Sequence, residues 1–229
     1  MEYIGSELTL FSHAINWKSY FAKAIKPYIK GDVLEVGAGL GVNSKFLLNP
    51  QVSSWHYLEP DEKLCSQIQE NMPAGLQQYA ITAGTINALE GLSFDTVLYI
   101  DVLEHIAQST EELEKLQRFV TPGGHLIILV PAYNFLFSEF DKSIGHYRRY
   151  NKRIIKSEVP QGFAQVKLFY LDSLGVIASI ANKLFLHQDN PTAKQVSFWD
   201  KVIVPLSKIT DKVFFRSFGK SLIGIYRRK

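Results

Sequence analysis

The sequence predicts an α/β fold: a doubly wound, mainly parallel sheet of seven strands, whose last strand runs antiparallel and follows a helical insertion. Three observations predict it. Short, wholly apolar runs alternate with amphipathic stretches, as in parallel sheets that are covered on both faces. The first apolar run opens directly into closely spaced glycines, which is typical of a strand–turn–helix unit. After Pro131 this alternation changes, and a long helical stretch separates two final strand candidates.

The elements of the first half follow from spacing. Apolar residues three and four apart predict a helix over 8–28. The run 32–36 is too brief for a helix and predicts a buried strand. A helical pattern over 42–48 and a second strand over 54–58 come next, and a helix that starts at Pro60 and Asp61 follows them.

In the second half, proline and glycine mark where the predicted elements begin and end. Thr121, Pro122 and two glycines end a helix and introduce a strand that Pro131 closes. The remaining strands are predicted at 78–82, 94–100, 125–130, 165–170 and 221–226.

Composition restricts the class of protein. The 229 residues are 46% hydrophobic and 21% charged, which excludes a disordered or fibrous chain. A net charge of +3 is too small to indicate a nucleic-acid partner. We expect one domain over 1–229, with an N-terminal helix in 1–31, a ligand-binding core in 32–131, and the helical insertion and last strands in 132–229.

Compartment and membrane contact are predicted from cysteine and apolar content. Cys65 is the only cysteine, which excludes an internal disulfide or a cysteine zinc cluster and favours a reducing compartment. The N-terminus does not resemble a signal peptide, and no stretch reaches the roughly eighteen apolar residues that a spanning helix needs. We therefore predict a cytoplasmic protein without a transmembrane segment, in which Leu174–Leu186 is a surface for lipid or substrate.

The glycine turn is the most informative segment. A strand that runs into Gly37, Gly39 and Gly41 lets a ligand approach the main chain itself, because side chains would block that approach. In doubly wound sheets this turn lies where nucleotides bind. Val42 stands where a dinucleotide fingerprint needs its third glycine, and the carboxylate of Glu35 would repel a diphosphate. A ligand with a positive charge suits this turn better.

An acid follows at the end of the second predicted strand. Glu59 comes about twenty residues after the turn, where a carboxylate can accept hydrogen bonds from both hydroxyls of a ribose. The alternative is that Glu59 only caps the helix that begins at Pro60.

These motifs resemble a known family. Glu35–Gly41, Glu59 and Asp101–His105 (DVLEH) are similar to the first, second and fourth motifs of the class I S-adenosylmethionine-dependent methyltransferases. Pro122–Gly124 resembles the turn before their fifth strand. The likeness is closest to a small-molecule branch that includes quinone-pathway enzymes, and Gly145–Tyr150 (GHYRRY) resembles members that accompany bacterial polysaccharide genes.

This resemblance implies a Rossmann-like fold, S-adenosylmethionine as cofactor and S-adenosylhomocysteine as product. The turn amides would lie near the methionine carboxylate, Glu35 near its ammonium group and Glu59 at the ribose. Gly84 and Thr85 replace an acid that many relatives use for adenine, which leaves the adenine to main-chain groups or to Asn87. The implied cofactor-binding residues are Glu35, Gly37, Ala38, Gly39, Gly41, Glu59, Pro60, Thr85, Asp101, Val102 and Leu103.

Methyl transfer needs alignment more than a special group. It is an in-line displacement, so most of the gain can come from holding nucleophile and methyl carbon in contact, and we expect no metal. A hydroxyl acceptor requires a base, for which the candidates are His146, His105 and Asp101. His146 is preferred, because His105 and Asp101 could equally cap a helix or form a wall of the site.

The acceptor side is predicted from two further segments. Residues 142–156 carry six basic side chains, and the neighbouring Asp141 is the one acid beside them. We interpret His146, Tyr147, Arg148 and Arg149 as substrate-binding, with a solvated helix face as the alternative. The apolar stretch 174–214 indicates core packing first, and dimer contact or an acceptor surface second.

Several functions remain open at this point. The leading hypothesis is methylation of a small-molecule acceptor, which could be acidic, lipid-linked, a sugar or quinone-like, and we predict the methylated atom to be oxygen. The alternatives are a nicotinamide- or flavin-dependent oxidoreductase and a non-catalytic nucleoside-binding module. We expect peripheral membrane contact at most and no nucleic-acid partner; DVLEH stands where enzymes that methylate base amines would have a proline-rich motif. The sequence leaves the oligomeric state open.

Overall fold

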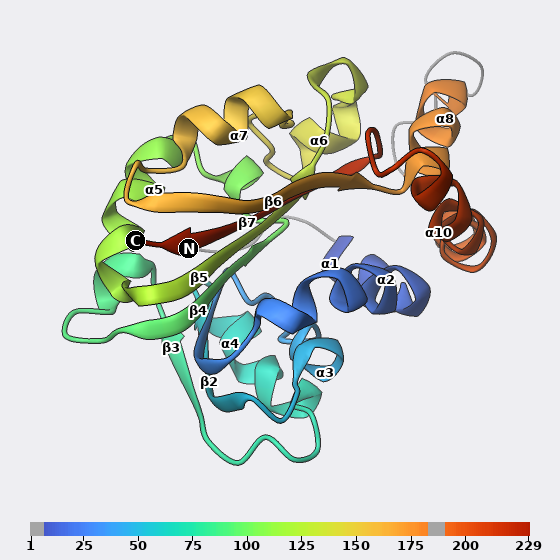
Figure 1. Cartoon of the computed structure of the whole chain (residues 1–229). Coiled ribbons are helices and arrows are strands. Elements are labelled where there is room, and N and C mark those ends of the chain that lie inside the picture. Colours follow the sequence, from blue (N-terminus) through green and yellow to red (C-terminus); the bar gives the residue numbers. More distant parts are fainter. Residues whose placement is uncertain (1–6, 183–190) are drawn as a thin grey trace.

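A single seven-stranded sheet organises the chain (Figure 1). The computed structural model describes residues 7–182 and 191–229. The strand order is β3-β2-β1-β4-β5-β7-β6; the first five strands are parallel, and β7 runs antiparallel between β5 and β6. The predicted fold class is confirmed. The strands are β1 (Gly31–Val36), β2 (Val52–Glu59), β3 (Tyr79–Ala83), β4 (Phe94–Ile100), β5 (Val120–Pro131), β6 (Phe163–Leu171) and β7 (Ser221–Arg228).

Helices cover both faces of this sheet. Buried side chains of α2, α3, α4 and α10 contact one face, and those of α5 and α7 contact the other (Figure 1). A π-helical segment, η8 (Trp199–Ile203), joins α9 to α10. The helices are α1 (Glu7–Ser12), α2 (Ile15–Ile25), α3 (Ser44–Leu47), α4 (Glu62–Ile68), α5 (Ser109–Leu116), α6 (Glu139–Ser143), α7 (Lys152–Glu158), α8 (Ser173–Ala181), α9 (Ala193–Phe198) and α10 (Val204–Val213).

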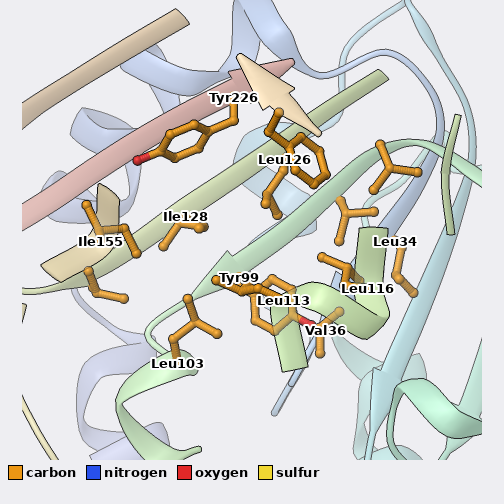
Figure 2. Close-up of a cluster of buried hydrophobic side chains, with 14 of the residues drawn as sticks. Leu34, Val36, Tyr99, Leu103, Leu113, Leu116, Leu126, Ile128, Ile155 and Tyr226 are labelled. Carbon is orange, nitrogen blue, oxygen red and sulfur yellow. The ribbon is translucent and has the colours of Figure 1, made fainter. Parts of the chain in front are cut away.

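The two-residue period of β1 assigns its side chains to the two layers. Leu34 and Val36 belong to the cluster that also contains Leu113 and Leu116 of α5 (Figure 2). The intervening position, Glu35, is directed to the opposite face, because successive side chains of a strand alternate. A sheet buried on both faces explains why its strands are apolar at nearly every position.

Three elements differ from their predicted bounds. The predicted first helix is two helices, α1 and α2, separated at His13 and Ala14. The predicted helix over 42–48 shrinks to Ser44–Leu47, because a hydrogen bond from Gly41 N–H to the Ala38 carbonyl (2.8 Å) keeps the chain in a turn. β5 starts at Val120, so the glycines before 125 lie within the strand rather than before it. There the pairing with β4 shifts register.

The helical insertion is anchored on buried carboxylates. Asp211 of α10 accepts hydrogen bonds from the Tyr20 hydroxyl (2.8 Å) and from the main-chain N–H groups of Asp172 (2.7 Å) and Ser173 (2.8 Å). Asp172 accepts from the Trp199 indole (2.8 Å). These polar contacts therefore hold the insertion to α2 and to the end of β6. The predicted apolar residues Leu184, Phe185 and Leu186 lie outside the described residues.

Much of this insertion is not core. Val196 and Val204 are buried, whereas Ile177, Ile209 and Val213 are exposed. The expectation that the stretch 174–214 mainly packs in the core is therefore wrong for its helical surface. Within 7–182 and 191–229, none of the helices has the length and apolar content to cross a bilayer.

Candidate active site

The glycine turn at the carboxyl end of β1 is bare main chain in a left-handed conformation. Gly37, Gly39 and Gly41 have φ angles of +63°, +55° and +71°, which other residues rarely adopt. A Cβ atom added at Gly37 would lie 2.7 Å from a methyl group of Val102, and one at Gly41 would lie 2.9 Å from Ile68. Conformation and close packing therefore both require glycine at these two positions.

Glu59 braces this turn. One of its oxygens accepts a hydrogen bond from Gly39 N–H (2.8 Å), and the other accepts from Asp61 N–H (3.0 Å). Asp61, not Glu59, caps α4 by accepting from the N–H groups of Lys63 and Leu64, so the capping alternative for Glu59 is wrong. A carboxylate has about four acceptor sites. Glu59 therefore keeps the capacity to accept ribose hydroxyls while it fixes the turn.

The side chain of Glu35 is buried on the face of the sheet opposite to Leu34 and Val36. Its oxygens accept hydrogen bonds from the Asn43 amide (2.9 Å) and the Trp55 indole (3.1 Å), and burial raises the pKa of Glu35 to about 7. The Lys18 ammonium donates to the Asn43 carbonyl (3.1 Å), and burial lowers the pKa of Lys18. Lys18 and Asn43 were missed in the sequence, because a lysine and an asparagine in a helical pattern resemble solvated positions. The predicted contact of Glu35 with a ligand ammonium group stays a prediction.

The segment after β4 reaches the turn from the neighbouring strand. Val36 pairs with Tyr99, so residues beyond Ile100 emerge beside the glycines. Asp101 has a φ of +54°, and its side chain is open to solvent although protein atoms surround it closely; that environment raises its pKa to about 6. The predicted place of Asp101 at the wall of the site stays a prediction. Leu103, in contrast, packs in the core, which corrects its predicted position at the border of the site (Figure 2).

The residues predicted to contact adenine follow the ends of β2 and β3. Gly84 N–H donates to the Glu59 carbonyl (3.0 Å), which places Thr85 near the bracing acid. Thr85 and Asn87 are exposed, and Pro60 is half-buried between Glu59 and the cap of α4. These positions are compatible with the predicted roles of Pro60 and Thr85, which stay predictions.

Two histidines meet beyond Asp101. The rings of His105 and His146 lie edge to face with centroids 4.5 Å apart. Burial lowers the pKa of His105 to about 4, which makes it a weak base. His146 Nδ1 lies 2.8 Å from an oxygen of Asp141, whose pKa is held well below its usual range by hydrogen bonds from His146 and Arg149. Because an anionic Asp141 can only accept, His146 Nδ1 is the donor of this pair, and in a neutral ring Nε2 is then the acceptor that a general base requires.

The arginines of the GHYRRY segment have partners inside the chain. Arg149 is buried and forms a bidentate pair with Asp141 through Nε (2.9 Å) and a terminal nitrogen (2.8 Å). Arg148 donates to the Ser109 hydroxyl and the Ala107 carbonyl. The assignment of Arg148 and Arg149 to substrate binding is therefore corrected: both guanidinium groups fasten this segment to the rest of the fold. Tyr147 is 61% exposed and remains available to an acceptor.

Comparison with known proteins matches part of the chain to a methyltransferase domain. Residues 34–126 match the family model described as a methyltransferase domain. A tRNA U34 carboxymethyltransferase from Idiomarina loihiensis is 33% identical over 101 residues, which are 42% of this chain and 31% of that protein. The chain thus spans about a third of the length of this curated relative.

Two solved structures share the fold at low identity. The chain bound to the Trm112 methyltransferase activator of Haloferax volcanii has a TM-score of 0.64 and 16% identity, with 93% of this chain and 90% of that one covered. The N-methyltransferase NodS of Bradyrhizobium japonicum WM9, in complex with S-adenosylhomocysteine, has a TM-score of 0.57 and 11% identity, with 93% and 85% covered. Residues 34–126 thus match a methyltransferase domain, and the chain shares its fold with these two solved structures.

Proposed function

We propose that this chain transfers a methyl group from S-adenosylmethionine to a hydroxyl group of a small-molecule acceptor. The observation that carries the proposal is the glycine turn, which Glu59 braces on one side and Asp101 approaches from the next strand. A turn flanked by carboxylates disfavours a diphosphate and suits a cationic nucleoside. When bound, S-adenosylmethionine supplies an electrophilic methyl group on a sulfonium ion.

The residues of the chain would then position the reactants. Glu59 would accept hydrogen bonds from the ribose hydroxyls, the turn amides would donate to the methionine carboxylate, and Asp101 would lie near the positive charge. Alignment of the acceptor oxygen with the methyl carbon provides most of the rate gain. His146, oriented by Asp141, accepts the hydroxyl proton at Nε2 as the new bond to oxygen forms. S-adenosylhomocysteine is the product.

Calorimetric titration separates this proposal from the oxidoreductase alternative. Purified protein is titrated with S-adenosylhomocysteine and, separately, with NAD. We expect saturable binding of S-adenosylhomocysteine and none of NAD, because Val42 replaces the third glycine of the dinucleotide fingerprint, which close packing of the helix on the strand requires. Saturable binding of NAD alone would contradict the proposal. Binding of S-adenosylhomocysteine without turnover of any acceptor would instead favour the non-catalytic module.

Replacing Glu59 with glutamine should weaken S-adenosylhomocysteine binding by about 1–3 kcal/mol, or roughly 5- to 150-fold. The amide keeps the size of the side chain but loses acceptor sites for the turn and the ribose. The matched control is Glu62→Gln, an exposed acid at the start of α4 that should leave the affinity unchanged. Equal affinities of the two variants would remove Glu59 from the binding site.

The exposed surface of the insertion supports a lipid-linked acceptor. The only acids in residues 191–216 are Asp200 and Asp211, and both are buried, so the exposed charges there are all positive. Apolar groups interleaved with lysines are typical of proteins that lie on anionic bilayers. We name this surface, which covers α8 to α10, the apolar–basic surface. Its exposed apolar residues are Ile177, Ile180, Phe198, Val202, Leu206, Ile209, Val213, Phe214 and Phe215.

Vesicle sedimentation tests this acceptor class. The protein should bind vesicles with phosphatidylglycerol more strongly than pure phosphatidylcholine, and salt should weaken the binding. The double variant Ile209→Ser, Val213→Ser should reduce binding by roughly tenfold or more, because each exposed side chain that enters the lipid contributes on the order of 1 kcal/mol or more. Leu92→Ser, an exposed apolar residue outside the apolar–basic surface, is the control. Equal vesicle binding by the wild type, the double variant and Leu92→Ser would show that the apolar–basic surface does not bind lipid.

A further inference from the structure

Glu104 is a buried acid without an adequate partner. Its side chain is 0% exposed, and neither carboxylate oxygen has a hydrogen-bond partner of good geometry in the described part of the chain, apart from a contact with its own main-chain amide. A buried polar group without partners is costly, and a native structure that retains one calls for a reason such as an ion. The methyl-transfer mechanism above gives Glu104 no task.

Two histidines surround this acid. One donor atom from each of Glu104, His105 and His146 lies within 4.8 Å of the other two, and Glu104 Oε1 is 3.9 Å from His146 Nε2. Ligand atoms on an ion with bonds of about 2.1 Å are roughly 3.4 Å apart in a tetrahedral site. The three side chains therefore need to move inward by only on the order of 1 Å to share an ion.

The histidines are held by partners outside this cluster. His146 gives its Nδ1 proton to Asp141 (2.8 Å), which also accepts hydrogen bonds from Arg149 and Ser138 and is thereby fixed. His146 Nε2, with its lone pair, points toward Glu104. A ring nitrogen of His105 is hydrogen-bonded to main chain at Ile144. Histidines that bind metals usually donate their other ring N–H to a carboxylate or a carbonyl in this way.

We propose that Glu104, His105 and His146 bind a divalent transition-metal ion. Two imidazole nitrogens and one carboxylate oxygen form a ligand set that suits Zn²⁺, Fe²⁺, Mn²⁺ or Co²⁺, and three protein ligands leave a position open. This proposal replaces the metal-free site that the sequence predicted. It does not depend on the methyl-transfer proposal, because it concerns only the donor atoms and their geometry.

The ion would also have a place in the chemistry. Asp101, which stands between this cluster and the glycine turn in the chain, interacts electrostatically with both His146 and Glu104. An acceptor hydroxyl bound at the open position would lose its proton more readily, because a bound cation lowers the pKa of an oxygen ligand. With the ion on His146 Nε2, this nitrogen could not also act as the general base described above. The proton would pass to water instead, and the oxygen would be left as the nucleophile.

Cobalt provides a direct test. The full-length protein, stripped with a chelator and dialysed, is titrated with Co²⁺ while visible absorption and calorimetry are recorded. We expect one ion per chain and d–d bands with the intensity of a four- or five-coordinate site. Glu104→Gln and His146→Asn should each weaken binding at least tenfold, and Zn²⁺ should displace Co²⁺ from the wild-type protein.

His13→Asn is the matched control, because His13 is exposed and lies outside the cluster. Its variant should bind Co²⁺ like the wild type. Denaturant unfolding and S-adenosylhomocysteine titration of each variant show whether it is folded. Absence of Co²⁺ binding in the folded wild-type protein, equal binding in all folded variants, or loss of binding in His13→Asn would each overturn the metal site. None of these results would contradict the proposed binding of the cofactor at the glycine turn.

Discussion

Arg149→Ala is expected to lower the free energy of unfolding by about 3–5 kcal/mol, since it leaves the buried carboxylate of Asp141 without its main cation. Asp141 also caps α6 and holds His146, so the loss extends beyond one ion pair. Urea unfolding followed by tryptophan fluorescence measures the change. The GHYRRY segment should then be the first to lose its hydrogen-exchange protection.

Arg148→Ala is the matched control one residue earlier. Arg148 is half-buried and donates to a hydroxyl and a carbonyl, so we expect a loss of only about 1–1.5 kcal/mol. Similar losses in the free energy of unfolding for the two variants would mean that the buried Arg149–Asp141 pair stabilises the fold no more than the hydrogen bonds of Arg148 do. An Arg149 variant of unchanged stability that bound an acidic acceptor more weakly would restore the substrate-binding interpretation of the sequence.

Asp211→Ala should also destabilise the protein by about 3–5 kcal/mol. The change leaves three buried donors without an acceptor, namely the Tyr20 hydroxyl and the N–H groups of Asp172 and Ser173. Each unsatisfied donor costs about 1–3 kcal/mol. The same experiment in urea measures this loss. Because the network joins the insertion to α2 and β6, we expect the apolar–basic surface to become protease-sensitive before the sheet does.

Tyr20→Phe is the control for this network. It removes one of the three hydrogen bonds to Asp211 and keeps the aromatic packing with Trp17, so the expected loss is about 1 kcal/mol. If Asp211→Ala were no more destabilising than Tyr20→Phe, water would have to enter and accept hydrogen bonds from the main-chain N–H groups that Asp211 had bound. The insertion would then be held mainly by its apolar contacts.

The fold was largely predictable because its strands are buried on both faces. Apolar runs such as 94–100 are too short and too uniform for helices, and their alternation with amphipathic stretches fixes the topology class. The start of β5 was not predictable. Thr121–Gly124 has the composition of a turn, and only the pairing of Phe94 with Val120 draws these residues into the sheet.

The site was predictable where local sequence determines it. Glycines that need left-handed φ angles and an acid at a strand end are visible without any tertiary contact. Asp141 and Glu104 were missed as functional positions, because each gains its role only from residues that lie far away or on other loops. For the same reason Arg149 was misinterpreted: a cation with a buried partner looks, in sequence, like a cation without one.

The position of β7 has a consequence for biosynthesis. The last strand in the chain lies between β5 and β6, so the sheet has a gap in its interior until residues 221–228 have left the ribosome. During translation, the edge of β5 and the whole of β6 would lack the neighbour that satisfies their main-chain groups. We therefore expect the half of the molecule that carries the apolar–basic surface to acquire its final structure only after residues 221–228 have left the ribosome, and chaperones to bind the exposed edges of β5 and β6 before then.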